Sequence, residues 1–178
     1  MERSVSLGPV TPADHAVLLD MNNQAAPAVN ALTEEEWSTL LELSVWTRAA
    51  HVGGAPVAFL LGLDGPGLDY RSENYAWFSA AYDRFLYVDR VVVAPHARSR
   101  GLGGRLYDAF ADFGTRVGHS VLCAEVNIDP PNPGSLRFHE HHGFRPVGEQ
   151  DTKGGSVRVR MLARELRPGG PVGGDLVG

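Results

Sequence analysis

The segment with the clearest chemical capacity is Arg98-Ser99-Arg100-Gly101-Leu102-Gly103-Gly104, which precedes a stretch with helical periodicity. A helix N-terminus presents unpaired N–H groups and the positive end of the helix dipole. Glycines let the backbone approach phosphate oxygens, and the two arginines add positive charge. The segment therefore predicts a cradle for a pyrophosphate. It lacks the Gly-Lys-Ser/Thr of a P-loop and a full Gly-x-Gly-x-x-Gly fingerprint, so a glycine-rich turn that binds nothing is the alternative.

Two carboxylates are candidates for a general base. Glu125 lies in the apolar segment Val121–Val126, where a carboxylate is costly unless it has a task or a partner. A paired structural carboxylate is the alternative reading of this residue. Asp89 is the main rival base. The alternation of a strand predicts that one face carries Tyr87, Asp89, Val91 and Val93.

The chain also contains a histidine cluster, His139-Glu140-His141-His142. A histidinium at position 139 could donate a proton near neutral pH, whereas a histidine packed on a helix is the alternative. The cluster does not match His-Glu-x-x-His and has no set of cysteines to complete it. We therefore expect no metal site.

The elements that must position these groups follow from the hydrophobic pattern. The predicted strands are Val5–Leu7, Trp46–Val52, Val57–Leu63, Phe85–Val93, Val121–Val126, Arg145–Glu149 and Ser156–Leu166. The predicted helices follow Thr11 and Thr33 and cover Gly103–Val117 and Gly134–His142. Strands alternating with helices in this order predict an α/β or α+β domain around a mixed sheet.

Size and composition set further limits. The chain has 178 residues, a net charge of -5 and one cysteine, Cys123. We expect one domain over residues 1–167 and a disordered Gly/Pro-rich tail over 168–178. The buried-looking single cysteine and the lack of an apolar leader or span predict a cytoplasmic protein without membrane association. The acidic balance gives no reason to expect nucleic-acid binding, and a homodimer is compatible with these features.

Two motifs resemble those of a known family. The run Val91-Val92-Val93-Ala94-Pro95, followed by Arg98-x-x-Gly101-x-Gly103 and a helix, resembles motif A of the GNAT superfamily of acetyl-CoA-dependent N-acetyltransferases. The segment Ala124–Asn127, then Asn132 and Phe138–Phe144, resembles motif B. The resemblance implies a GNAT fold, with a central mixed, mostly antiparallel sheet of about six to seven strands flanked by helices.

The resemblance also implies a binding site for acetyl-CoA. The exposed backbone of Val91–Val93 would bond the pantetheine arm and polarise the thioester carbonyl. The loop amides would hold the pyrophosphate, and Asn132 and Phe138 would lie beside the cofactor arm. The implied cofactor-binding set is Val91, Val92, Val93, Arg98, Ser99, Arg100, Gly101, Leu102, Gly103, Gly104, Asn132 and Phe138.

The implied reaction is direct acetyl transfer, within a ternary complex, to the primary amine of a small molecule or a peptide N-terminus. Glu125 aligns with the base of ribosomal-protein N-terminal acetyltransferases, so Glu125 and His139 are the catalytic candidates. The family usually has a tyrosine, the proposed acid for the leaving thiolate, seven residues after the asparagine. His139 occupies that position here, which is a departure from the pattern.

The acceptor side is implied by the fold to lie along the first helices and the loop before the phosphate-binding strand. The candidate substrate-binding residues are Asn22, Asn23, Tyr75, Trp77, Phe78, Tyr87 and Asp89. The aromatic residues would form a lid over an amine, or they would simply cover the core. Two functions compete with acetyl transfer: a CoA-binding module without catalysis, and transfer of another acyl group.

Overall fold

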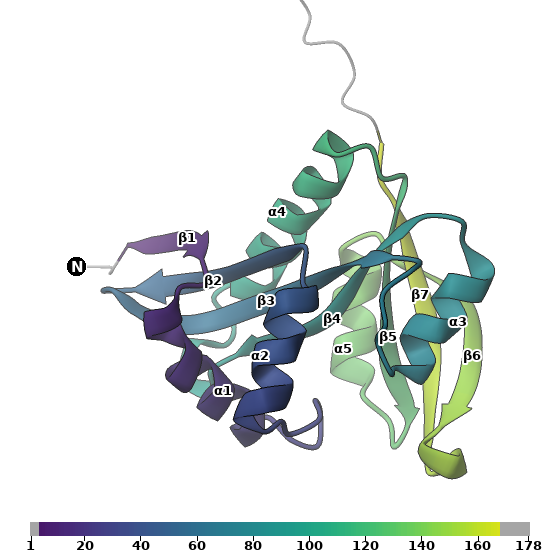
Figure 1. The fold of residues 1–178 in the computed structure, drawn as a ribbon, viewed down its shortest axis with the longest axis horizontal. Coiled ribbons are helices and arrows are strands. Elements are labelled where there is room, and N and C mark those ends of the chain that lie inside the picture. The colour runs from purple at the N-terminus through teal and green to yellow at the C-terminus, as the bar shows by residue number, and fades with distance from the viewer. Residues whose placement is uncertain (1–3, 168–178) are drawn as a thin grey trace, which may run out of the picture.

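The architecture is a seven-stranded mixed sheet, seen in a computed structural model that describes residues 4–167 (Figure 1). The spatial order of the strands is β1-β2-β3-β4-β5-β7-β6. The strands are β1 Val5–Pro9, β2 Trp46–Val52, β3 Ala55–Gly65, β4 Phe85–Val93, β5 Val121–Asp129, β6 Arg145–Thr152 and β7 Val157–Glu165. Only β4 and β5 pair in parallel, which confirms the predicted, mostly antiparallel sheet. The predicted tail, 168–178, lies outside the described residues.

Five helices cover the two faces of the sheet. They are α1 His15–Gln24, α2 Glu34–Leu43, α3 Glu73–Ala81, α4 Leu102–Arg116 and α5 Pro133–His141. Buried residues of α1, α2 and α3 belong to one apolar cluster, and those of α4 pack with α5 side chains in the other. Of the described helices, none is long and apolar enough to cross a membrane.

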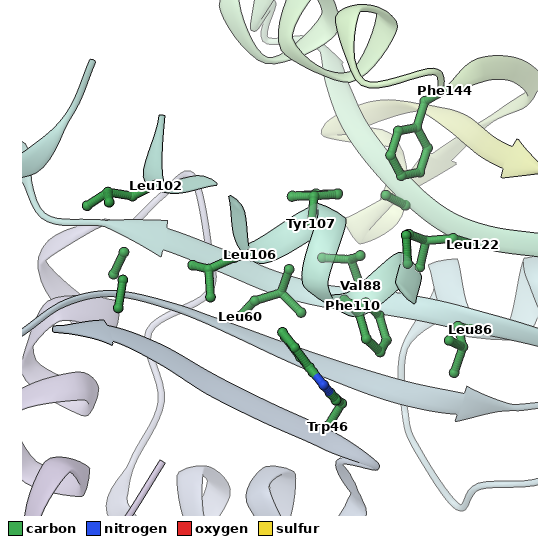
Figure 2. Packing of buried hydrophobic residues seen from close by; sticks show 14 of the residues in the cluster. Trp46, Leu60, Leu86, Val88, Leu102, Leu106, Tyr107, Phe110, Leu122 and Phe144 are labelled. Carbon is green, nitrogen blue, oxygen red and sulfur yellow. The ribbon is translucent and has the colours of Figure 1, made fainter. Parts of the chain in front are cut away.

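The helix α4 anchors the cluster on its face of the sheet (Figure 2). Its residues Leu106 and Phe110 are fully buried, and the Phe110 ring lies 5.0 Å from that of Trp46 on β2. Burial of this aromatic pair fixes the helix against the sheet. The glycine-rich segment at the N-terminus of α4 is thereby held at the end of β4.

The strand β4 contains a β-bulge at Asp89. Leu61 of β3 pairs with Arg90, whereas the next residue, Gly62, pairs with Val88, so Asp89 is an extra residue on β4. A bulge reverses the alternation of the side chains that follow it. Tyr87 accordingly packs in the α1–α3 cluster, and Val91 and Val93 pack against the α4–α5 cluster. The prediction that Tyr87, Asp89 and these valines share one face is wrong for this reason.

The ladder between β4 and β5 is short. It joins only Leu86 to Leu122 and Tyr87 to Cys123. Beyond these pairs the two strands diverge, and the rest of β4 and β5 face each other without main-chain pairing (Figure 1). A gap in the middle of a sheet exposes backbone groups that otherwise bond to a neighbouring strand.

Candidate active site

A cavity of about 280 Å³ occupies the gap between β4 and β5. One wall is the backbone and side chains of Val91–Val93, and the opposite wall carries Glu125. The lining also includes Asn132 and His139 of the α5 region, Tyr107 of α4, and Ala25, Ala28 and Val29 of the segment after α1. The structure thus brings both predicted catalytic residues and the predicted thioester-binding strand into one cavity.

The predicted phosphate cradle forms a second cavity, of about 590 Å³, that shares Val93 and Arg98 with the first. Gly101 precedes α4 with φ +71°, a left-handed conformation that glycine adopts without strain. A Cβ on Gly103 would come within 3.4 Å of the Phe138 ring, and one on Gly104 within 2.6 Å of the His142 ring. Gly103 and Gly104 therefore let α4 lie close to α5. The cavity is lined by the start of α4 together with Arg98 and Arg105, and this helix N-terminus with two cationic side chains fits a pyrophosphate.

Asn132 has a local structural role in addition to its predicted one. Its side-chain oxygen accepts a hydrogen bond from Ser135 N–H at 3.2 Å and caps α5. An asparagine cap stabilises the first turn of a helix. It fixes the start of α5 beside the cavity between β4 and β5.

The carboxylate of Glu125 is the most perturbed acidic group of the cavity. Its neighbours Ala124 and Val126 pack towards α4, so Glu125 points to the α1–α3 face, as Tyr87 does. Tyr87 donates a hydrogen bond of 3.0 Å to Glu125 Oε1, and Glu125 Oε2 is buried without a hydrogen-bond partner. Burial raises the pKa of Glu125 to about 8, because it disfavours the charged form more than the Tyr87 hydroxyl supports it.

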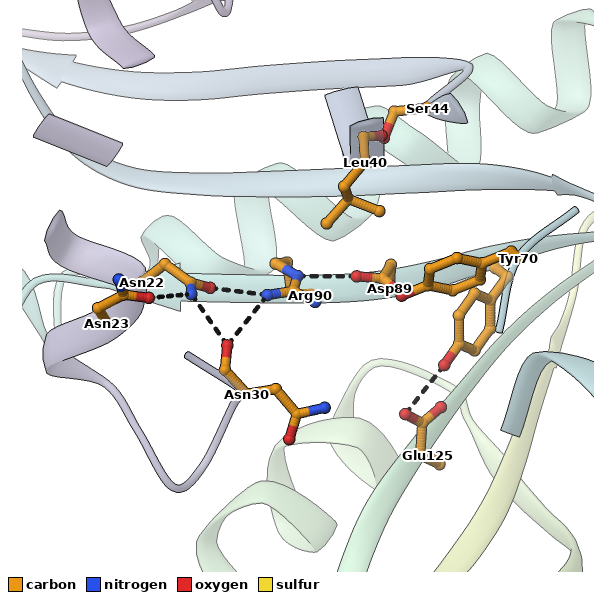
Figure 3. Close-up of polar contacts among 10 residues, drawn as sticks. Asn22, Asn23, Asn30, Leu40, Ser44, Tyr70, Asp89, Arg90 and Glu125 are labelled. Carbon is orange, nitrogen blue, oxygen red and sulfur yellow. Dashed lines mark hydrogen bonds and ion pairs between the residues drawn. The ribbon is translucent and has the colours of Figure 1, made fainter. Parts of the chain in front are cut away.

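The rival base, Asp89, is fully engaged with its neighbours (Figure 3). Tyr70 donates its hydroxyl hydrogen to Asp89 Oδ1, and Arg90 Nε donates to Oδ2 at 2.7 Å. The side chains of this ion pair are only 3% and 6% exposed for Asp89 and Arg90. Because both oxygens already accept hydrogen bonds from buried donors, Asp89 is far less suited than Glu125 to accept a proton from a substrate.

The segment between α1 and α2 is tied to this ion pair. Arg90 donates to Asn22 Oδ1 at 2.9 Å, and Asn22 Nδ2 donates to the Asn30 carbonyl at 3.0 Å. Asn23 binds both the N–H and the carbonyl of Leu32. Asn22 is completely buried, and neither asparagine lines the cavities beside Glu125. The prediction that these two asparagines contact the acceptor is therefore corrected, because they hold the segment that covers the cavity.

A further cavity of about 290 Å³ lies on the α1–α3 side of Glu125. Its lining is mostly polar and includes Tyr70, Asn74, Tyr87, Asp89, Glu125, Asn127 and Lys153. Lys153 Nζ reaches across it to Asn30 Oδ1 at 2.9 Å. This cavity meets the first one at Asp89, Arg90, Glu125 and Asn127, so Glu125 lies between the two cavities and lines both.

The aromatic residues proposed as a lid lie elsewhere. They belong to helix α3, which the sequence interpretation left unassigned. Tyr75 and Phe78 are 3% and 0% exposed in the core, and Trp77 packs over Gly148 of β6. The prediction of a lid from Tyr75, Trp77 and Phe78 is therefore wrong, because all three cover the sheet.

Comparison with known proteins identifies the group to which this arrangement belongs. A family model described as the acetyltransferase (GNAT) family matches residues 19–144. The chain belongs to the GNAT acetyltransferase family. Its acyltransferase class and its fold are thereby established, as the two sequence motifs predict.

Solved structures share this GNAT fold at low sequence identity. The ribosomal-protein-S18-alanine N-acetyltransferase of Escherichia coli aligns with a TM-score of 0.71 at 16% identity, over 95% of this chain and 98% of that one. NAA60 of Arabidopsis thaliana, solved with a bisubstrate analogue, aligns with a TM-score of 0.73 at 16% identity, over 93% and 100%. A putative acetyltransferase of Salmonella typhimurium, solved with acetyl-CoA, aligns with a TM-score of 0.69 at 17% identity, over 93% of this chain and 95% of that one. The search of curated proteins found no match.

In this GNAT chain His139 is buried rather than free to exchange protons with solvent. It is 4% exposed, and its Nδ1 lies 2.8 Å from the Ser135 carbonyl oxygen. Burial lowers its pKa, because a charged imidazolium is poorly solvated there. The neutral form therefore prevails at neutral pH, which removes the basis for the predicted histidinium donor.

Sequence reasoning missed Tyr107, whose hydroxyl lies 2.8 Å from His139 Nε2. The available signal was its place on the buried face of α4, three residues before Phe110. A tyrosine at a core position brings a hydroxyl that needs a partner, whereas phenylalanine would not. The partner comes from α5, 32 residues later, and that distance is invisible to local patterns.

Proposed function

We propose that this GNAT enzyme transfers the acetyl group of acetyl-CoA to a primary amine, with Glu125 as the general base. The observation that carries the proposal is the buried, unpartnered Oε2 of Glu125, in a cavity that adjoins the phosphate cradle. A carboxylate with a pKa of about 8 matches the task of taking a proton near neutral pH.

Acetyl-CoA fits the two adjoining cavities. The loop from Arg98 to Gly104 would hold its pyrophosphate, and Val91–Val93 would bond its pantetheine arm along the unpaired edge of β4. Acetyl-CoA supplies an activated acetyl group as a thioester. The acetyl-CoA bound in the Salmonella structure of the same fold supports this choice.

The acceptor would enter from the α1–α3 side. The polar cavity beside Glu125 offers carboxylate, amide and hydroxyl groups, which suit an ammonium group and its polar substituents. An ammonium has no lone pair, so Glu125 must remove one proton before the nitrogen can attack. Tyr87 orients the Glu125 carboxylate through the hydrogen bond to Oε1 and leaves Oε2 to receive that proton.

The acceptor is proposed as a small molecule or a peptide N-terminus, and the two similar enzymes NAA60 and S18-alanine N-acetyltransferase support only the general class. We also propose a cytoplasmic location. This proposal is supported by the single cysteine, Cys123, which is a buried free thiol. Disulfide bonds are common in secreted proteins and rare in cytosolic ones.

The test is a thiol-release assay with acetyl-CoA against amines, polyamines, amino acids and peptides. The wild-type protein is compared with Glu125→Gln, and CoA affinity is measured for both. Acceptor-dependent thiol release by the wild type alone supports the proposal. Tight CoA binding without release for every acceptor would favour the alternative, a CoA-binding module without catalysis, which the lack of a charged donor at His139 favours.

A further inference from the structure

Tyr107 forms a hydrogen-bonded chain with His139 and the backbone of α5. The Tyr107 ring is 1% exposed and packs edge-on against Phe138, His139 and Phe144, with centroids 5.3 to 5.6 Å away. These ring contacts do not themselves require a hydroxyl on residue 107. The hydroxyl is therefore the feature that packing leaves unexplained.

The direction of the hydrogen bonds in this chain follows from the Ser135 carbonyl. A carbonyl oxygen can only accept, so the 2.8 Å contact places the proton of His139 on Nδ1. Because burial lowers the pKa of His139, the ring carries only that proton. His139 Nε2 is then an acceptor, and Tyr107 donates its hydroxyl hydrogen to it at 2.8 Å.

The position of Tyr107 relative to the sheet gives this hydroxyl a chemical opportunity. Tyr107 lies on the α4–α5 side, where the phosphate cradle also lies, and Glu125 points to the α1–α3 side. Both residues line the same cavity in the gap between β4 and β5. An amine activated by Glu125 would thus approach from one face, and the leaving sulfur would depart towards the other.

We propose that the Tyr107 hydroxyl donates a hydrogen bond to the sulfur of the leaving thiolate, and that His139 positions this hydroxyl in the cavity. The inference rests on the proposed function. The electron pair of the breaking C–S bond stays on sulfur, and the hydrogen bond of Tyr107 moves from His139 Nε2 to that sulfur. Glu125 takes the first proton of the ammonium, solvent takes the second, and solvent returns one to sulfur on release.

In this step Tyr107 keeps its own proton. Burial raises the pKa of the Tyr107 hydroxyl, so it stabilises an anion as a hydrogen-bond donor rather than by ionising. A fixed donor aimed at a developing charge in a water-poor site stabilises that charge more than solvent does.

The direct test is titration of the CoA thiol in its complex with the protein, followed by the ultraviolet absorbance of the thiolate. It requires no acceptor. The protein has one thiol, Cys123, and burial raises its pKa. Cys123 therefore stays protonated and does not add to the thiolate absorbance. Tyr107→Phe should raise the pKa of the bound thiol by about one unit, a tenfold change in acidity. His139→Phe should raise the pKa of the bound thiol by a smaller amount, because it removes the group that positions the donor and leaves the donor itself in place.

Turnover provides the second readout. Tyr107→Phe should lower kcat roughly 10²-fold with little change in the KM for acetyl-CoA. Tyr82→Phe, at the end of α3 on the opposite face, is the matched control and should behave as wild type. The double variant Tyr107→Phe/His139→Phe removes donor and acceptor together and leaves no unpartnered atom of the pair, so it keeps the test valid should either single variant unfold.

Three results would overturn the proposal. If the pKa of the bound CoA thiol rises in His139→Phe and stays at the wild-type value in Tyr107→Phe, His139 is the donor. If Tyr107→Phe has the thiol pKa and the turnover of the wild type, Tyr107 is a packing residue. The proposed function stays intact in that case, provided that Glu125→Gln has still lost activity. A wild-type protein that does not bind CoA would refute this proposal and the proposed function together.

Discussion

Replacing Glu125 with glutamine should make the protein more stable at alkaline pH while it removes activity. The folded protein holds the Glu125 proton up to a pKa of about 8, whereas the unfolded chain releases it near 4.5. Between these values the unfolded state binds fewer protons, so wild-type stability falls as pH rises. The full span corresponds to about 5 kcal/mol, since one pKa unit is about 1.4 kcal/mol.

The glutamine variant does not lose this contribution, because it does not titrate. Its amide would place an unpartnered donor where Oε2 is buried, at a pH-independent cost of about 1–3 kcal/mol. The variant should therefore be less stable than wild type near pH 5 and more stable near pH 9. Urea unfolding of both proteins across this range measures the difference, in which all other titrating groups cancel.

Activity supplies the complementary measurement. A base must be deprotonated to act, so wild-type kcat/KM should rise with pH through a limb near 8. Glu125→Gln should lower turnover by roughly 10²–10⁴-fold and lose that limb. A stability difference that is flat with pH, or that favours wild type more at alkaline pH, would refute the reasoning, because Glu125 would then be ionised and well supported in the fold.

Three further outcomes are expected. Acetyl-CoA should raise the melting temperature, with about 2.7 kcal/mol of stabilisation at 100 times Kd, and an unchanged melt at millimolar ligand would contradict the cradle. Gly101→Val and Gly103→Val should abolish CoA binding measured by calorimetry without unfolding the protein, whereas Gly8→Val on the edge strand β1 should bind normally. Asp89→Ala should lower the free energy of unfolding in urea by roughly 3–5 kcal/mol, because Arg90 is left as a buried, unpaired charge. The rise of activity at alkaline pH should persist in this variant. An unaltered free energy of unfolding would contradict the role of this ion pair.

The cradle and the sheet were predictable because their signals are local. Glycines and arginines at the start of a helix predict a phosphate site without reference to any distant residue. Short segments bounded by turn signals located each of the seven strands of the described sheet, with errors of a few residues at the ends. The sequence predicted a mixed sheet without assigning its parallel pair, and the intervening helix α4 explains why β4 and β5 pair in parallel.

The remaining features depend on contacts between distant segments. The bulge at Asp89 arises from the register with β3, and no pattern within β4 marks it. Helix α3 has an apolar stretch, Tyr75–Phe78, that covers the sheet with little polar contrast between its faces, so periodicity could not separate it from a lid. The neutral state of His139 depends on burial and on the contact with Ser135, which only the packed structure provides.

Both irregularities of β4 serve the placement of the proposed groups. Pairing with β5 ends at Tyr87, and the bulge follows two residues later at Asp89. The first opens a passage between the two faces of the sheet. The second turns Val91 and Val93 towards α4 while Tyr87 stays on the face of Glu125. A regular strand paired along its whole length would close the passage, and without the bulge it would turn these valines towards the α1–α3 face. The proposed base and the proposed leaving-group donor can therefore reach one cavity from opposite faces only because β4 departs from regular geometry twice within its length.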